Sequence, residues 1–387
     1  KHFDRSYNCP YIQALPDTTR SAIDYKKYDT KIIRPVFHMD RGRKEIEKTL
    51  KQIGKSIKHK TNNIDRCMAR AFEAQERFDR WQTERGQEVL SGNAPALVLV
   101  TRSYNSYDTG LNLNLAEKLR KLGMTVIPID FLPMKEMAEE IGRDYPYMYW
   151  RSGQKILAAA RYIGRTANLF AVYLTNFNCG PDSYITKFFE KEMHGKPYLS
   201  LEIDEHSADV GMQTRCEAFI DTIKNARNLA TKSSHPSSTV PLATMSRNGR
   251  TIYIPYMDDH GFVIAAAFRS AGIDAQALPP SDDESLAIGR KYTSGRECFP
   301  SIITTGDIIK KSHSPDFKPA HSAFFMPTAK GPCRFGQYNK LHRMVLDEVG
   351  LHDVPLVTFD QTANFHKDMA VLGSAKFKKN VWRGLVL

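Results

Sequence analysis

Short apolar runs alternate with amphipathic helical stretches over most of this chain, and this alternation constrains the fold more than any other feature. Ala94 to Thr101 has the composition of a buried strand, a helical pattern follows from Leu111 to Leu122, and a second strand is expected at Thr125 to Ile129. Gly123 stands where the helix should end. A strand, a helix and a second strand in this order are typical of a β-α-β unit with parallel strands.

The same alternation continues to residue 203 and resumes after residue 250. It predicts helices over Gln154–Ile163, Ser183–His194 and Val263–Gly272, and strands over Leu169–Leu174, Tyr198–Ile203, Thr251–Pro255, Ala323–Met326 and Pro355–Thr358. Two further helices are expected to begin at Cys298 and at Cys333. The pattern predicts an α/β protein with two facing parallel-sheet domains of the flavodoxin-like or Rossmann-like kind.

The chain also divides into parts of different composition. From Ile33 to about Gln87, apolar residues recur at helical spacing, which predicts two long helices. Thr231 to Val240 is rich in Ser, Thr and Pro and has no apolar period, as expected of a domain boundary. We therefore expect four parts: a helical N-terminal segment over 1–93, α/β domains over 94–230 and 248–387, and a linker over 231–247.

The net charge of +12 comes from 55 Lys and Arg against 43 Asp and Glu, and it is concentrated early in the chain. Basic clusters at 41–44 and 55–60 flank and interleave with Ile46, Leu50 and Ile53 at helical spacing. Charges placed in this way form the solvent-facing side of an amphipathic helix. We therefore expect no nucleic acid partner; an acidic redox protein is the better alternative, because opposite charges speed the encounter of two proteins.

Nothing in the chain predicts export or a membrane span. Apolar runs such as Ala94 to Val100 stop well short of about 18–20 residues. The first five residues lack the apolar core of a signal peptide, and six widely spaced cysteines favour reduced thiols. The sequence therefore predicts a cytoplasmic protein. Its start at Lys1, without Met, suggests a piece of a longer chain.

Four of the six cysteines lie in turn-forming sequences, where proline or glycine interrupts regular structure and leaves the sulfur free to point into a shared cleft. Their settings are Asn8-Cys9-Pro10, Asn178-Cys179-Gly180-Pro181, Cys298-Phe299-Pro300 and Gly331-Pro332-Cys333. Three of them precede predicted helices, whose positive N-terminal ends favour the thiolate that binds metal. The pattern predicts one metal cluster, in the cleft between the domains, held by Cys9, Cys179, Cys298 and Cys333.

The spacing of these cysteines leaves the kind of site open. The intervals of 170, 119 and 35 residues contain no C-x-x-C pair and match no ferredoxin or zinc ribbon. An iron–sulfur cluster, a zinc-stapled scaffold and uncoordinated cysteines are all compatible with them. Cys67 and Cys216 lie within predicted helices and are expected to pack in the core. As ligands instead, they would bring the number to six, enough for two linked cubanes.

Three other motifs are weaker. Gly54-Lys55-Ser56 resembles the end of a P-loop, but no strand precedes it, so we expect no ATP binding there. Glu202 to His206 gathers acids and an imidazole at a strand end, where they could bind a metal, move protons or form a hydrogen-bonded loop. Three polar residues are expected to cap the helix near Leu111: Asn105, Asp108 and Asn112.

Four segments carry a resemblance to a known family, namely Phe177 to Ser183, Leu201 to Arg215, Glu297 to Pro300 and Met326 to Tyr338. They resemble the dehydratase-like region of the large 2-hydroxyacyl-CoA dehydratase activase-related proteins. Relatives of that region include 2-hydroxyacyl-CoA dehydratase subunits and double-cubane cluster proteins of anaerobes. The resemblance spans most of the chain. The segment around Cys333 is the longest and most specific, whereas the one around Cys9 is short.

The resemblance implies an iron–sulfur redox protein that takes part in ATP-driven, low-potential electron transfer. It implies a 4Fe–4S cluster, with a double cubane (8Fe–9S) as the alternative, and an ATP-dependent reductase or activase as the partner, either a subunit or a domain of the same longer chain. A homodimer is also expected from it. If the protein is an enzyme, the resemblance implies a low-potential reductase or a 2-hydroxyacyl-CoA dehydratase-like lyase. Arg334, beside Cys333, could offset cluster charge or receive an acidic group of a partner.

Overall fold

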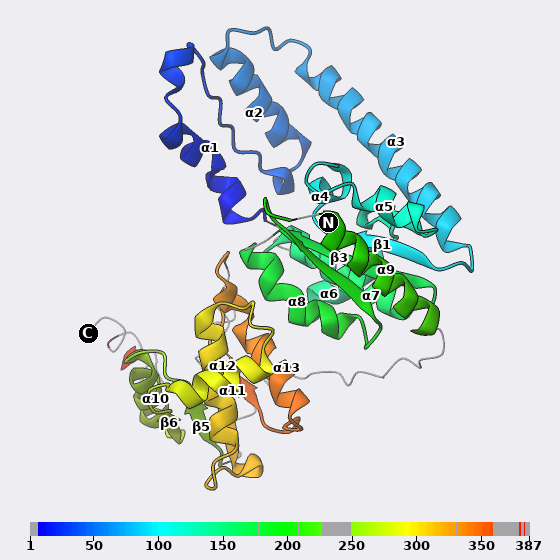
Figure 1. The fold of residues 1–387 in the computed structure, drawn as a ribbon. Coiled ribbons are helices and arrows are strands. Elements are labelled where there is room, and N and C mark those ends of the chain that lie inside the picture. The colour runs from blue at the N-terminus through cyan, green and yellow to red at the C-terminus, as the bar shows by residue number, and fades with distance from the viewer. Residues whose placement is uncertain are drawn as a thin grey trace. The chain divides into compact units, whose positions relative to one another are not determined.

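A computed structural model describes residues 7–176, 179–207, 209–226, 249–329, 331–358, 379, 380 and 383 (Figure 1). The chain divides into two compact units. Unit 1 comprises Lys1–Tyr7, Pro95–Ile129 and Met134–Leu387, and unit 2 comprises Asn8–Ala94 and Asp130–Pro133. The predicted linker over 231–247 lies outside the described residues.

The first half of unit 1 is built on a four-stranded, all-parallel sheet. Its strands are β1 (Ala96–Val100), β2 (Thr125–Pro128), β3 (Leu169–Asn176) and β4 (Tyr198–Ile203), in the order β2-β1-β3-β4. Every residue of β1 is buried. A parallel strand covered on both faces reads as a continuous apolar run, which is why this strand was evident in the sequence.

The second half of unit 1 repeats this arrangement with shorter strands. They are β5 (Thr251–Ile254), β6 (Ala275–Ala277), β7 (Ser322–Phe325) and β8 (Leu356–Val357), again all parallel and in the order β6-β5-β7-β8. Numbered within each sheet, both orders are 2-1-3-4, the flavodoxin-like order. The predicted α/β class with two parallel sheets is confirmed.

Helices connect these strands as parallel crossovers require. In unit 1 they are α4 (Ser103–Tyr107), α5 (Leu115–Lys121), α6 (Lys135–Asp144), α7 (Arg151–Arg165), α8 (Gly180–Glu192), α9 (Asp209–Ala226), α10 (His260–Ser270), α11 (Asp283–Tyr292), α12 (Phe299–Ser312) and α13 (Tyr338–Glu348), with short 3-10 turns η5 (Pro319–His321) and η6 (Arg334–Gln337). Helices α4, α6 and α11 and strand β6 were not predicted, and the residues of α4 were expected to form a polar loop. Strand β6 has three residues, too few for a period to emerge.

The helix predicted from Leu111 begins four residues later. Leu113 and Asn114 have φ angles of 49° and 58°, in the left-handed region, so the chain cannot be helical before Leu115. Asp108 does accept a hydrogen bond from the backbone of Leu111, at 2.9 Å. The expectation that three polar residues cap this helix is therefore wrong in its position, because they serve the loop before it.

Two apolar cores pack against the sheets. The first is formed by β1, β3 and β4 with α5 and α9, and Cys216 is fully buried in it, as predicted. The second is formed by β5, β6, β7 and β8 with α10, where Phe268 packs edge to face on Phe325. Each sheet thus has its own core, as expected of two separate α/β layers.

Unit 2 is helical. It contains α1 (Pro10–Ala22), the 3-10 turns η1 (Tyr25–Tyr28) and η2 (Met39–Arg41), and the two predicted long helices, α2 (Arg43–Ser56) and α3 (Ile64–Leu90). Gly54-Lys55-Ser56 is the end of α2, so it has no P-loop geometry. Cys67 is exposed on α3, and the expectation that it packs in the core is wrong. None of the described helices is both long and apolar enough to cross a membrane.

Buried His342 on α13 predicts a loss of stability in acid. The side chain is 1% exposed, its Nε2 lies 3.2 Å from Thr304 Oγ1, and burial lowers its pKa to about 3. The unfolded chain therefore binds a proton near pH 6.5 that the folded chain does not, and stability falls as the pH drops below 6.5. Between pH 8 and pH 5 this residue should cost about 2 kcal/mol.

Urea unfolding at pH 8 and pH 5 checks this expectation. His342→Gln should lose less stability than the wild type over this interval, by about 2 kcal/mol. His206→Gln is the control, because His206 is exposed. An equal pH dependence in all three proteins would contradict the expectation.

Candidate metal centre

Cys179 lies between the end of β3 and the start of α8. Its backbone is extended (φ −64°, ψ 105°), it is the N-cap residue of α8, and Pro181 occupies the first turn. Proline suits this position because the first helical N–H groups have no partner within the helix. The carboxyl end of a parallel strand and the N-terminus of the next helix meet here, where ligands bind in α/β sheets.

A buried ion pair between Arg102 and Asp182 contacts Cys179. Arg102, just after β1, donates from Nε and Nη2 to the carboxylate of Asp182 at 2.9 and 3.0 Å, and from Nη2 to Cys179 Sγ at 3.3 Å. Arg102 is 6% exposed and Asp182 1%. Burial, and then the negative charge of Asp182, raise the pKa of the Cys179 thiol to about 11. Arg102 is thus aimed at the sulfur and kept there by Asp182.

Cys298 and Cys333 occupy comparable positions in the second half of unit 1. Cys298 is the N-cap of α12 with ψ 143°, and Cys333 is the N-cap of η6, which leads into α13, with ψ 134°. Cys333 follows β7, the strand that matches β3 in the sheet order. The predicted placement of Cys179 and Cys333 after strands and before helices, and of Cys298 before a helix, is confirmed.

Tyr338 connects the two cysteines of this half. Its hydroxyl lies 2.7 Å from Cys298 Sγ. Burial, followed by the hydrogen bond with Cys298 and the charges of Cys298 and Cys333, raises the pKa of its phenol. The phenol is thus in contact with the sulfur of Cys298.

Contacts between the helices that follow these cysteines bring the three N-termini of unit 1 together. Tyr184 of α8 lies with its hydroxyl 3.3 Å from Ser301 Oγ of α12, and its ring stacks on Tyr338 at 6.1 Å between centroids. A β-carbon added at Gly180 would lie 3.8 Å from the guanidinium carbon of Arg334. Cys179, Cys298 and Cys333 are thus each within a few residues of one of these contacts.

Cys9 belongs to unit 2, where it is the N-cap of α1 and is followed by Pro10. It has the same local geometry as the other three cysteines, with φ −58° and ψ 143°. Tyr7, two residues earlier, belongs to unit 1: its backbone pairs with Tyr149 and Arg151 at 3.1 and 3.0 Å. Its ring also stacks on Tyr149 at 4.7 Å.

A pocket of about 440 Å³ in unit 1 lies beside the Cys333 segment. Tyr7 forms one part of its lining and the residues directly before Cys333 form another; the lining is Tyr7, Pro146, Tyr147, Met148, Tyr149, Gly331 and Pro332. Gln337 supports this region by donating to the carbonyl of Tyr147 at 2.5 Å. Tyr7 and the two residues before Cys333 therefore line the same pocket.

No group of three or more His, Cys, Asp or Glu side chains among the described residues is arranged to hold a single metal ion. Zinc binds sulfur at about 2.3 Å, so its four sulfurs lie within about 4 Å of one another. In a cubane each cysteine binds a different iron, so the sulfurs stand farther apart. The residues present fit such a cluster by their donor chemistry, since three thiols stand at the N-termini of helices that contact one another.

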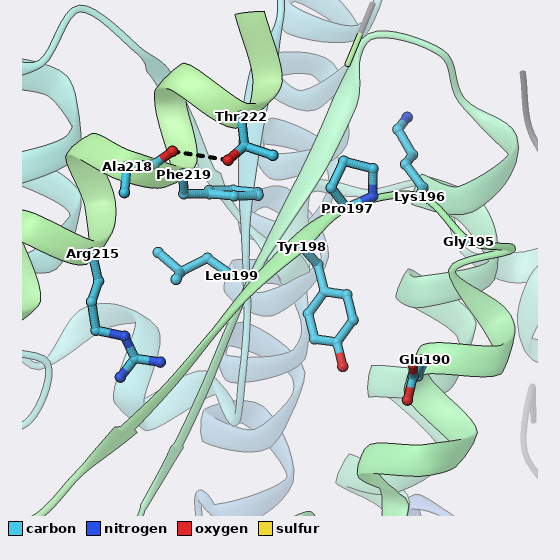
Figure 2. A pocket seen from close by; sticks show the side chains of 10 residues that line it. All are labelled: Glu190, Gly195, Lys196, Pro197, Tyr198, Leu199, Arg215, Ala218, Phe219 and Thr222. Atoms are coloured by element: carbon cyan, nitrogen blue, oxygen red, sulfur yellow. Dashed lines mark hydrogen bonds between the residues drawn. The ribbon is translucent and has the colours of Figure 1, made fainter. Parts of the chain in front are cut away.

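A second pocket, of about 500 Å³, lies at the amino end of the first sheet's strands, beside the start of β4 (Figure 2). Its lining comes from the end of α8, the start of β4 and α9, and includes Tyr198, Arg215 and Phe219. Lys196 at its rim donates to the carbonyls of Thr166 and Ala167 at 2.5 and 3.1 Å, after α7. This lysine caps a helix end, and we attach no activity to the pocket.

The remaining candidate residues form local structure. Asp204 accepts from the hydroxyl of Ser207 and from the backbone of His206 at 2.9 and 3.0 Å, which is the hydrogen-bonded loop alternative for this segment. Asn105 is buried after β1 and donates to Asn176 Oδ1 at the end of β3, at 3.0 Å. It ties two strand ends together close to Cys179.

Arg102 and Tyr338 are the residues at this site that the sequence analysis missed. Arg102 is 77 residues from the sulfur that it contacts, and Tyr338 is 40 residues from its own. One signal was present: Tyr184 and Tyr338 each follow a loop cysteine by five residues. An arginine directly after a buried strand was a second signal, because that position lies at the ligand-binding edge.

Comparison with known proteins places one part of the chain. No curated protein and no solved structure matches it. Residues 1–132 match the family model described as the CoA enzyme activase uncharacterised domain (DUF2229), and this match covers about a third of the chain. The N-terminal third is therefore similar to a domain that is associated with CoA enzyme activases.

Proposed function

We propose that this protein is an iron–sulfur redox protein, which holds one 4Fe–4S cluster through Cys9, Cys179, Cys298 and Cys333 and takes part in ATP-driven, low-potential electron transfer. The observation that carries the proposal is the convergence in unit 1, through Tyr184 and Tyr338, of three helix N-termini that each have cysteine at the N-cap position. Thiolates at positive helix ends suit an anionic cluster.

Cys9 is proposed as the fourth ligand because its local geometry matches that of the other cysteines. Like Cys179 and Cys298, it is the N-cap residue of a helix that has proline in its first turn. A thiol at such a position points away from the helix that follows it and is free to bind metal.

The residues around the cysteines would bind the cluster and adjust its reduction potential. A bound cluster supplies one-electron transfer, and its potential depends on burial and on hydrogen bonds to the sulfurs. Arg102 donates to Cys179 Sγ, while Asp182 neutralises its charge and fixes its direction. Arg334, beside Gly180, adds a positive charge that is available to a cluster or to an acidic group of a partner.

The partner that we propose is an ATP-dependent reductase or activase. The similarity of residues 1–132 to the CoA enzyme activase-associated domain supports it. Because the P-loop-like residues Gly54-Lys55-Ser56 are the end of a helix, we assign ATP hydrolysis to the partner or to another domain. We propose a cytoplasmic location, because a reducing compartment keeps exposed thiols such as Cys67 reduced and protects an oxygen-sensitive cluster.

Iron and acid-labile sulfide per chain, measured on anaerobically purified protein, test the proposal. We expect about four of each, with an EPR signal of a reduced cubane. Serine at any of Cys9, Cys179, Cys298 or Cys333 should lower the iron content severalfold. Cys67→Ser is the matched control, since Cys67 is exposed and is not assigned as a ligand.

Each other outcome has a definite meaning. About eight iron with nine sulfide would replace the single cubane by a double cubane, and with it electron transfer by the reduction of a small substrate. Zinc without iron would overturn the redox function in favour of a zinc-stapled scaffold. Full iron content in all four serine variants would show that these cysteines are not the ligands.

A further inference from the structure

We propose that Tyr338 is a positioning residue that donates a hydrogen bond from its hydroxyl to the sulfur of Cys298 and thereby raises the reduction potential of the cluster. This inference rests on the proposed function, since it concerns the same site.

The contact between Tyr338 and Cys298 is fixed by the packing around it. The hydroxyl of Tyr338 is 2.7 Å from Cys298 Sγ. Tyr338 is the first residue of α13 and is 5% exposed. Its ring is packed against three other rings, with centroids 5.2 Å from Phe335, 6.1 Å from Tyr184 and 6.1 Å from His342. The phenol therefore cannot swing away from the sulfur without repacking its neighbours.

The direction of the hydrogen bond follows from chemistry. A cysteine that binds iron has no proton on its sulfur, so the sulfur can only accept. A tyrosine phenol has an ordinary pKa near 10. The phenol is therefore protonated at neutral pH and is the donor.

The consequence for a cluster is electrostatic. Reduction places one more negative charge on the cluster and its sulfurs, and an N–H or O–H donor stabilises that charge. In a buried site this contact is stronger than in water. Tyr338 therefore favours the reduced state. Removing the hydroxyl should make the potential more negative.

Tyr253 provides a matched control. Like Tyr338 it is buried and packs against other rings, with centroids 6.2 Å from Phe317 and 6.1 Å from Phe324, but it lies on β5 within the second sheet. Phenylalanine at either position removes one hydroxyl and keeps the ring. Only the change at Tyr338 removes a hydrogen bond to a ligand sulfur.

The test is a redox titration followed by EPR, with iron, sulfide and resonance Raman spectra from the same samples. Tyr338→Phe should keep its iron and shift the reduction equilibrium about tenfold toward the oxidised state, about 59 mV for one electron. The Fe–S stretching frequencies should rise, because the sulfur is no longer shared with a donor. Tyr253→Phe should leave the reduction equilibrium within about twofold of the wild type and the Fe–S stretching frequencies unchanged.

A second variant, expected to shift the reduction potential in the opposite direction, covers the case in which Tyr338→Phe does not retain a cluster. Fluorinated tyrosine at position 338 keeps the ring and is a stronger donor, so it should shift the potential upward. An unchanged potential and unchanged Fe–S frequencies in the 338 variants would overturn the inference while the cluster, and the proposed function, stand. A wild-type protein without iron would instead overturn the proposed function itself.

Discussion

Replacing Gly306 by alanine is expected to lower the free energy of unfolding of unit 1 by about 3 kcal/mol or more. Gly306 lies on α12, where the helix crosses α11 with almost no space between the two backbones. A β-carbon at this position would lie 1.7 Å from the carbonyl oxygen of Ser285. Because the obstacle is backbone, no side-chain rotation can relieve it, and the helices must move apart.

The contact is reciprocal, which strengthens the expectation. Gly289 on α11 faces the carbonyl oxygen of Ile302 on α12, and a β-carbon there would lie 2.1 Å from it. Gly289→Ala should therefore be destabilising by a comparable amount. Since α12 begins at the Cys298 cap, either substitution should also lower the iron content of the protein, by displacing one proposed ligand.

Gly142→Ala on α6 is the control for both variants. A β-carbon at Gly142 meets nothing within 4 Å. Alanine in an open helical position should stabilise the protein by about 0.5–1 kcal/mol, through its higher helix propensity. Chemical denaturation of the three variants decides the matter: a Gly306→Ala protein as stable as the wild type would refute the close crossing of α11 and α12.

The strands that sequence reasoning could predict are those whose burial makes them uniformly apolar. β1 and β3 are continuous apolar runs because helices cover both faces of their sheet. β6 has three residues, of which Gln276 is exposed, so its pairing with β5 comes from the sheet and not from its own pattern. Tertiary context, not local propensity, makes it a strand.

Cys67 and Cys216 show the limit of the helical pattern. Both lie in line with apolar residues at helical spacing, yet only Cys216 is buried. Helix α9, which carries Cys216, packs on the first sheet, whereas α3 buries only Met68, Gln82 and Gly86 along its 27 residues. Helical spacing identifies a face of the helix, but what covers that face depends on the rest of the fold.

The positions of the cysteines could be predicted from local sequence, whereas the residues that contact their sulfurs could not. Proline or glycine beside Cys179, Cys298 and Cys333 is a local signal, so their placement at helix N-termini could be predicted. The contacts of Arg102 and Tyr338 with sulfur join residues 77 and 40 positions apart. They arise from the packing of helices against each other, which a single sequence does not reveal.

Replacing Arg161 by methionine is expected to destabilise unit 1 by about 3–5 kcal/mol, because it leaves a buried carboxylate without its counter-charge. Arg161 on α7 donates from Nε to Glu192 Oε2 at 2.6 Å, and both side chains are almost fully buried. Tyr145 also donates to Glu192, at 2.6 Å. The guanidinium further contacts Glu140 and Asp144 of α6, so one side chain joins α6, α7 and α8.

A double-mutant cycle separates the ion pair from simple loss of packing. Arg161→Met together with Glu192→Gln should recover a large part of the stability that Arg161→Met loses, because the uncompensated charge is gone. Arg85→Met is the surface control: its pair with Glu88 is exposed on both sides, and the change should cost less than about 0.5 kcal/mol. If Arg161→Met costs no more than Arg85→Met, the buried pair does not hold the three helices together. Because α8 begins at the Cys179 cap, a loosened α8 should also lower the iron content, and the double variant should restore it.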